Sequence, residues 1–115
     1  MRTHKLFVYG TLKTYPPFLE FLERGVVRYL CKGKIKAKKI KFEYPAVVED
    51  KKNLVSGEIF EIIEPNLVFP VLDEYEEFNP KNPVESLYVR KIKRAVLENG
   101  KLGYVFVYIF NKKNK

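Results

Sequence analysis

Four carboxylate side chains crowd into five positions of the segment 72–78. They are Asp73, Glu74, Glu76 and Glu77, and they follow an apolar stretch with helical spacing. Negative charge at the C-terminus of a helix opposes the helix dipole, so the cluster is locally unfavourable. If Glu76 points inward among aromatic side chains, loss of water favours its protonated form and makes it an acid/base usable near neutral pH. The alternative is a solvated acidic turn.

The turn Tyr9-Gly10-Thr11-Leu12 is a second candidate site. A glycine that follows a strand allows backbone conformations or close ligand approach that a side chain would resist. The backbone N–H groups of such a turn can hold a carboxylate or stabilise charge that develops on a carbonyl oxygen. An ordinary strand-to-helix turn, with Tyr9 in the core, is the simpler interpretation.

Tyr88 and Arg90 form a third candidate, because alternation along a strand puts both on one face. Arg90 has three possible partners: a residue across the sheet, one of the helix-end carboxylates, or a substrate carboxylate held by its forked donors. Ser56, Cys31 and His4 show no nucleophile-base arrangement, which argues against a serine or cysteine hydrolase. With a single cysteine and no Cys/His cluster, we expect no disulfide, no metal and no cofactor.

Two helices and a first strand would position these residues. The segment 5–9 is short, aromatic and β-branched, and Gly10 ends it, so it is predicted to be a buried strand. Apolar residues at helical spacing between Pro16 and Gly25 predict a first helix, and 64–75 predict a second one that Pro70 should kink or shorten.

The rest of the chain reads as extended segments. These are 26–30, 33–42, 44–48, 54–62, 87–97 and 103–110. We expect a bend at 31–33, a hairpin turn at 49–53 and a two-residue hairpin turn at Asn99-Gly100. Gly57 predicts a bulge or a close backbone approach. Together the segments predict an α+β fold, a small mixed β-barrel or curled sheet flanked by two helices, with one domain over 1–110 and a polar tail over 111–115.

The net charge of +8 raises the question of nucleic acid. Six lysines lie in the segment 32–41, largely alternating with small or apolar residues, as on a strand with one solvated face. We therefore expect a solvated strand rather than a phosphate-binding track, and the pattern argues against a nucleic-acid partner. No stretch resembles a signal peptide or a membrane span, so no membrane association is expected, and cysteine usage favours a reducing, cytoplasmic location.

Five motifs, in order, resemble the γ-glutamylcyclotransferase-like family, including its AIG2-like and γ-glutamylamine cyclotransferase branches. They are Phe7-Val8-Tyr9-Gly10-Thr11-Leu12, Tyr44-Pro45-Ala46, Val55-Ser56-Gly57-Glu58-Ile59-Phe60, Leu72-Asp73-Glu74-Tyr75-Glu76 and Tyr88-Val89-Arg90. The resemblance covers nearly the whole chain and implies a small mixed β-barrel flanked by helices. It also implies cyclisation of a γ-glutamyl group to 5-oxoproline with release of a free amine, without a cofactor.

By the family pattern, Glu76 takes a proton from the α-amine of a γ-glutamyl substrate and returns it to the leaving amine. The resemblance further implies that the backbone at Gly10, Thr11 and Leu12 binds the polar end of the substrate, and that the Tyr9 and Tyr88 side chains shape the cavity.

Two departures from the pattern leave alternatives open. The chain continues past Leu12 without the usual glycine and asparagine, and Glu77 stands where a glycine commonly follows the glutamate. Either Glu76 or Glu77 could therefore face the pocket. A non-catalytic small-molecule-binding module of the same fold, or a nucleic-acid-binding protein using the segment 32–41, are the other functions considered.

Overall fold

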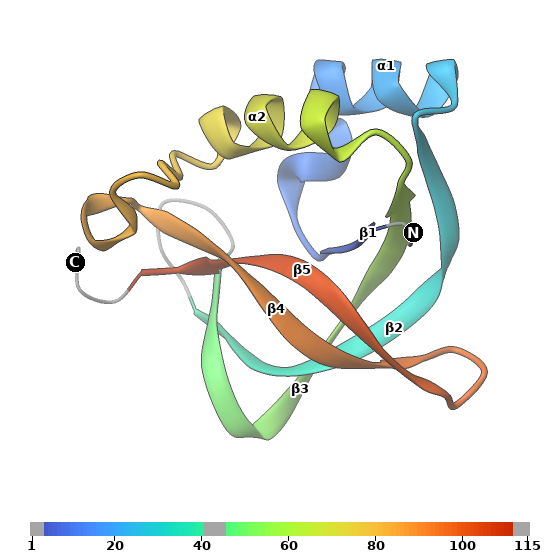
Figure 1. Ribbon diagram of the computed structural model, residues 1–115. Coiled ribbons are helices and arrows are strands. Elements are labelled where there is room, and N and C mark those ends of the chain that lie inside the picture. The colour runs from blue at the N-terminus through green and yellow to red at the C-terminus, as the bar shows by residue number, and fades with distance from the viewer. Residues whose placement is uncertain (1–3, 41–45, 112–115) are drawn as a thin grey trace.

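The fold is a closed five-stranded barrel with both α-helices on one side of it (Figure 1). The structure is a computed structural model that describes residues 4–40 and 46–111. Its elements in chain order are β1 (His4–Val8), η1 (Thr11–Thr14), α1 (Pro16–Arg24), β2 (Val27–Ile40), β3 (Ala46–Ile62), α2 (Pro65–Tyr75), η2 (Pro83–Glu85), β4 (Tyr88–Leu97) and β5 (Leu102–Phe110).

The strands close in the order β1-β3-β2-β4-β5. Neighbouring strands pair antiparallel except β1 and β5, which run parallel and meet at Leu6 and Phe106. The predicted α+β fold and mixed barrel with two flanking helices are therefore confirmed.

Two apolar cores follow from the alternation of side chains along the strands. Phe7 of β1 belongs to a cluster built from strand residues alone, which fills the barrel. Its neighbours Leu6 and Val8 point to the other side and pack with Phe18 of α1 and Leu72 of α2. The end of β1 is thus fixed from both faces, and that strand end leads directly into the candidate site.

The two long strands differ from the prediction. β2 has no bend at 31–33; it runs unbroken, with an irregularity in pairing between Tyr29 and Cys31. The prediction of a hairpin at 49–53 is wrong, because both halves of β3 pair with β2. The Asp50 Oδ1 atom accepts hydrogen bonds from the backbone N–H groups of Lys52 and Asn53, at 2.7 and 3.0 Å. This local turn makes a bulge in the strand and does not reverse the chain.

The turn between β4 and β5 also differs in detail. The Leu97 backbone N–H donates to the Lys101 carbonyl at 2.8 Å, and Gly100 lies at φ 86°. The loop therefore has three residues with a glycine in the left-handed position, a common alternative to the two-residue turn. The second helix runs its full predicted length through Pro70, so Pro70 does not shorten it.

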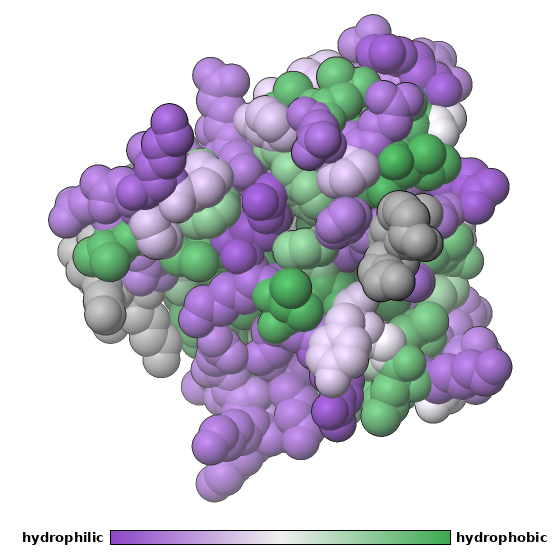
Figure 2. Space-filling view, viewed as in Figure 1, coloured by the Kyte–Doolittle hydropathy of each residue, from purple (hydrophilic) through white to green (hydrophobic). Residues whose placement is uncertain are grey.

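The lysine-rich strand has one solvated face, as predicted. Lys32, Lys34, Lys36 and Lys38 of β2 are exposed, whereas the residues between them are buried. On the face of the molecule drawn in Figure 2, hydrophilic side chains predominate and apolar ones form separate patches. Tyr44 and Pro45 lie outside the described residues, as does the tail beyond Asn111.

Candidate active site

One cavity of about 420 Å³ opens where the end of β1 meets the end of α2. Strands β4 and β5 supply its remaining walls. Its lining residues are Phe7, Val8, Tyr9, Gly10, Leu12, Tyr75, Glu76, Glu77, Tyr88 and Tyr108. The structure thus brings the glycine turn, Glu76 and Tyr88 to one place, although they lie far apart in the sequence.

Glu76 is the C-cap residue of α2, and its backbone N–H donates to the Leu72 carbonyl at 2.9 Å. Its side chain is partly buried, and this burial raises its pKa from 4.5 to about 7. The neighbouring Glu77 also lines the cavity but is exposed to solvent. Glu76 is therefore the more enclosed of the two adjacent glutamates, and its carboxyl group changes protonation state near neutral pH.

The chain leaves α2 through a left-handed residue. Glu77 has φ 56°, a conformation that glycine adopts far more readily than a residue with a Cβ atom. The Phe78 N–H reaches back to the Asp73 carbonyl at 2.8 Å, and the Glu77 N–H reaches the Glu74 carbonyl at 3.1 Å. These bonds close the helix end in a Schellman-type turn and fix the direction in which Glu76 leaves the helix.

The glycine turn forms the opposite wall. Gly10 is the N-cap residue of η1, Leu12 is buried, and the Tyr9 hydroxyl donates to the Tyr108 carbonyl at 2.7 Å. The first N–H groups of a helix have no acceptor within it, and Gly10 and Leu12 of this turn line the cavity. The side chain of Thr11 lies outside the described residues.

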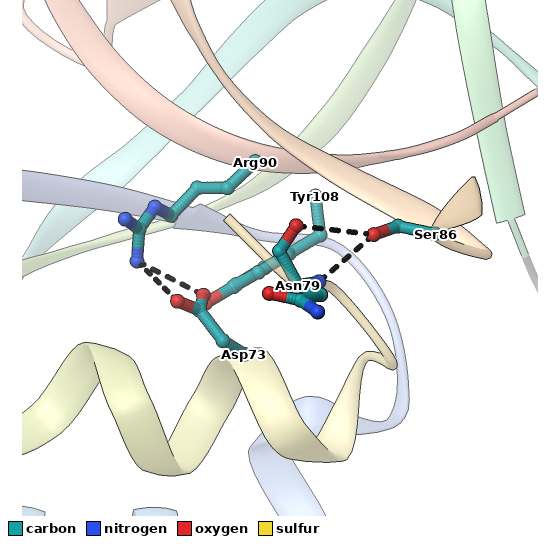
Figure 3. Close-up of polar contacts among 5 residues, drawn as sticks. All are labelled: Asp73, Asn79, Ser86, Arg90 and Tyr108. Atoms are coloured by element: carbon teal, nitrogen blue, oxygen red, sulfur yellow. Dashed lines mark hydrogen bonds and ion pairs between the residues drawn. The ribbon is translucent and has the colours of Figure 1, made fainter. Parts of the chain in front are cut away.

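Tyr88 is buried at the start of β4, with its ring edge-on to Phe110. Arg90, two residues on, is not among the described residues that line the cavity. One Arg90 Nη atom contacts both carboxylate oxygens of Asp73, at 2.9 and 3.0 Å (Figure 3). Of the three partners considered for Arg90, the structure shows a helix-end carboxylate.

Sequence reasoning missed Tyr108 and did not single out Asp73. The Tyr108 hydroxyl donates to the Asp73 Oδ1 atom at 2.6 Å, and burial together with that carboxylate raises the pKa of Tyr108. Burial raises the pKa of Asp73, and its contacts with Tyr108 and Arg90 oppose the rise. Alternation along β5 could have placed Tyr108 on the face of Phe110, but its partner 35 residues away has no sequence signal.

The cavity carries acidic and phenolic groups but no cation among its described lining residues. Within the described ranges 4–40 and 46–111, no three His, Cys, Asp or Glu residues come together as metal ligands. None of the helices in these ranges is long and apolar enough to cross a membrane. The chemistry that this arrangement can perform is proton transfer by Glu76 beside backbone donors.

Comparison with known proteins gives a family and a fold. The family model for gamma-glutamyl cyclotransferase, AIG2-like, matches residues 6–115. A solution structure of an Arabidopsis thaliana protein is 21% identical with a TM-score of 0.71, covering 100% of this chain and 73% of that chain. A crystal structure of an AIG2-like protein from Mus musculus is 26% identical with a TM-score of 0.66, covering 95% and 78%.

A further structure, named gamma-glutamyl cyclotransferase, is 14% identical with a TM-score of 0.63, covering 95% of this chain and 67% of that chain. A search among curated proteins gives no match.

Proposed function

Because the chain belongs to the gamma-glutamyl cyclotransferase, AIG2-like family, we propose that it cyclises the γ-glutamyl group of an amine or peptide, releasing 5-oxoproline and a free amine. The observation that carries this proposal is the shared cavity of Glu76 and the Gly10 turn. At about 420 Å³ the cavity lies within the size range of small-molecule sites.

The reaction is intramolecular, so proximity supplies much of the rate acceleration. The α-amine nitrogen of the substrate attacks the γ-carbonyl carbon, forming the C–N bond of the five-membered ring. The bond from that carbon to the leaving amine then breaks. Glu76 takes the proton that the α-amine loses and returns it to the leaving nitrogen, so atoms and charge balance.

The pKa of Glu76 suits this role. With a pKa of about 7, its carboxyl group exchanges a proton readily at neutral pH and is a stronger base than an ordinary carboxylate. We assign to it the general-base and general-acid steps in succession. Burial raises that pKa, and no lysine, arginine or histidine is among the described lining residues to oppose the rise.

The opposite wall would hold the substrate. We assign the backbone N–H groups at Gly10, Thr11 and Leu12 to the polar end of the γ-glutamyl group, where donors can also stabilise charge on the carbonyl oxygen. Tyr9 and Tyr88 shape the cavity, and Arg90 supports it through Asp73. No step requires a cofactor. We also propose a cytoplasmic location, on the basis of the single free cysteine Cys31.

The test is 5-oxoproline release from a panel of γ-glutamyl amines and γ-glutamyl dipeptides. Removing a general acid/base costs roughly 10²–10⁴-fold in rate, so we expect Glu76→Gln to lose that much of kcat. Glu77→Gln is the matched control, because it changes the adjacent, exposed carboxylate, and should retain most activity. Substrate binding without turnover would instead indicate a binding module, and activity that survives Glu76→Gln would refute the mechanism.

A further inference from the structure

A second carboxylate on α2 is buried without facing the cavity. Asp73 is 6% exposed and precedes Glu76 by three residues, so the two share one side of the helix. Its oxygens accept hydrogen bonds from two other elements, from Arg90 of β4 and from Tyr108 of β5 (Figure 3). The side chain therefore fastens the last turn of α2 to the barrel wall.

The main chain of the same residue closes the helix end. The Asp73 carbonyl accepts the Phe78 N–H at 2.8 Å, so this hydrogen bond closes the end of α2 around residues 74–77. Glu76, the C-cap residue, lies within the closed turn. Movement of Asp73 relative to β4 and β5 would consequently move the Glu76 carboxyl group relative to the rest of the cavity.

The hydrogen bonds continue to the other wall of the site. Tyr108, which donates to Asp73, lines the cavity, and its carbonyl accepts the Tyr9 hydroxyl at 2.7 Å. A connected path thus runs from α2 through β5 to the end of β1, where Gly10 begins the turn. Phe69 of α2 also contacts Arg90: the centre of its ring lies 4.2 Å from the guanidinium carbon.

We infer that Asp73 is a positioning residue, whose contacts with Tyr108 and Arg90 set the distance between the Glu76 carboxyl group and the Tyr9–Leu12 turn. The inference rests on the proposed function. A buried ion pair contributes little net stability compared with an apolar replacement, so stability alone gives a weak reason for this one. Catalysis gives a stronger reason, because a misplacement of about 1 Å can cost roughly 10²-fold in rate.

Two variants test the inference by kinetics. Asp73→Asn keeps the shape of the side chain, and Tyr108→Phe removes a single hydroxyl without uncovering a charge. We expect each folded variant to lose about tenfold or more in kcat with little change in KM, because alignment and not binding is impaired. Val105→Ala, in the barrel interior away from the cavity, is the control for a purely structural loss. Wild-type kcat in both folded variants would overturn the inference.

A second measurement does not depend on activity. Carbon-13 NMR titration of the side-chain carboxyl groups reports the pKa of Glu76. Five other titratable side chains line the same cavity: Tyr75 of α2, Glu77 of the turn after it, Tyr9 of the turn after β1, Tyr88 of β4 and Tyr108 of β5. If Asp73 holds Glu76 in place, the pKa of Glu76 should fall by about one unit or more in both Asp73→Asn and Tyr108→Phe. It should stay unchanged in Val105→Ala.

The kinetic and NMR measurements distinguish a failure of the proposed function from a failure of the positioning role. If the wild-type protein releases no 5-oxoproline, the proposed function fails, whereas the titration still decides whether Asp73 positions Glu76. If the pKa of Glu76 fell in the Asp73→Asn variant alone, the unpaired charge of Arg90 in that variant would explain the fall. This result would overturn the positioning role. Should Asp73→Asn fail to fold, the Tyr108→Phe variant decides by the same criterion.

Discussion

The carboxyl group of Glu76 loses water when the protein folds, and its pKa rises from 4.5 to about 7. Glu49 shows the opposite case. Hydrogen bonds from Lys91 and Lys93 lower its pKa to about 2. The two glutamates therefore affect stability with opposite signs. Glu49 loses a favourable interaction as the pH falls below 4.5, whereas Glu76 becomes an unfavourable charge as the pH rises from 4.5 through 7.

The first prediction follows from the destabilising effect of ionised Glu76. Between pH 4 and pH 8 the folded protein must ionise Glu76 in its partly buried place, which lowers the free energy of unfolding by about 1–3 kcal/mol. Glu76→Gln removes this cost, so its free energy of unfolding relative to wild type should rise by that amount from pH 4 to pH 8. Urea denaturation at the two pH values measures it.

Glu77→Gln is the control, because Glu77 is exposed and adjacent to Glu76. The control removes a carboxylate that is not enclosed by the protein, so its effect on the free energy of unfolding should change less between the two pH values than the effect of Glu76→Gln. A difference between Glu76→Gln and wild type that does not change with pH would show that Glu76 is hydrated in the folded state.

At the scale of an element, the C-terminus of α2 decides which of the two cavity-lining glutamates is the more buried, Glu76, and which stays exposed, Glu77. The second prediction concerns Glu77, whose φ of 56° costs a residue with a Cβ atom roughly 1–2 kcal/mol. Glu77→Gly relieves that cost but adds chain entropy to the unfolded state, so we expect a net stabilisation of about 0.5–1 kcal/mol. Chemical denaturation measures the change.

Glu74→Gly is the matched control within the same helix. Glu74 is exposed in the last turn and has a helical backbone, so glycine there should destabilise the protein by about 1 kcal/mol. Equal effects of the two glycine substitutions would contradict the left-handed conformation at position 77.

Element identities were predictable because local patterns specify them. The alternation of lysines in β2, the proline start and glycine end of α1, and the helical spacing of α2 all gave correct elements. Chain reversals were harder, because a polar cluster is compatible with more than one turn. Asp50 and Asn53 at 49–53 predicted a hairpin, but the Asp50 side chain closes a bulge within β3.

The candidate site was predictable only where its members lie in recognisable motifs. Gly10 and Glu76 belong to such motifs, and the structure places both at one cavity. The contacts of Asp73 with Arg90 and Tyr108 join residues 17 and 35 positions apart, and no local pattern encodes them. The difference between Glu76 and Glu77 depends on the helix end, which the sequence alone did not specify.

At the scale of the whole molecule, the position of β1 links the barrel to the site. β1 pairs with β3 on one side and with β5 on the other. Gly57 of β3 allows the first contact, because a Cβ atom there would lie 2.6 Å from the Phe7 Cζ atom and 2.6 Å from the Val8 carbonyl oxygen. The sequence-based expectation of a close backbone approach at Gly57 is confirmed.

The third prediction is that Gly57→Ala damages both the barrel and the site. The added methyl group meets a backbone oxygen that cannot move without shifting β1, so we expect destabilisation of about 1–3 kcal/mol or more. Phe7 and Val8 line the cavity and lead into the Gly10 turn, so kcat/KM for 5-oxoproline release should fall as well. Gly103→Ala is the control, because its Cβ atom would meet only the flexible Leu97 Cδ1 atom, at 3.1 Å. If both variants lose stability and activity equally, the approach of β1 to β3 does not determine the geometry of the cavity.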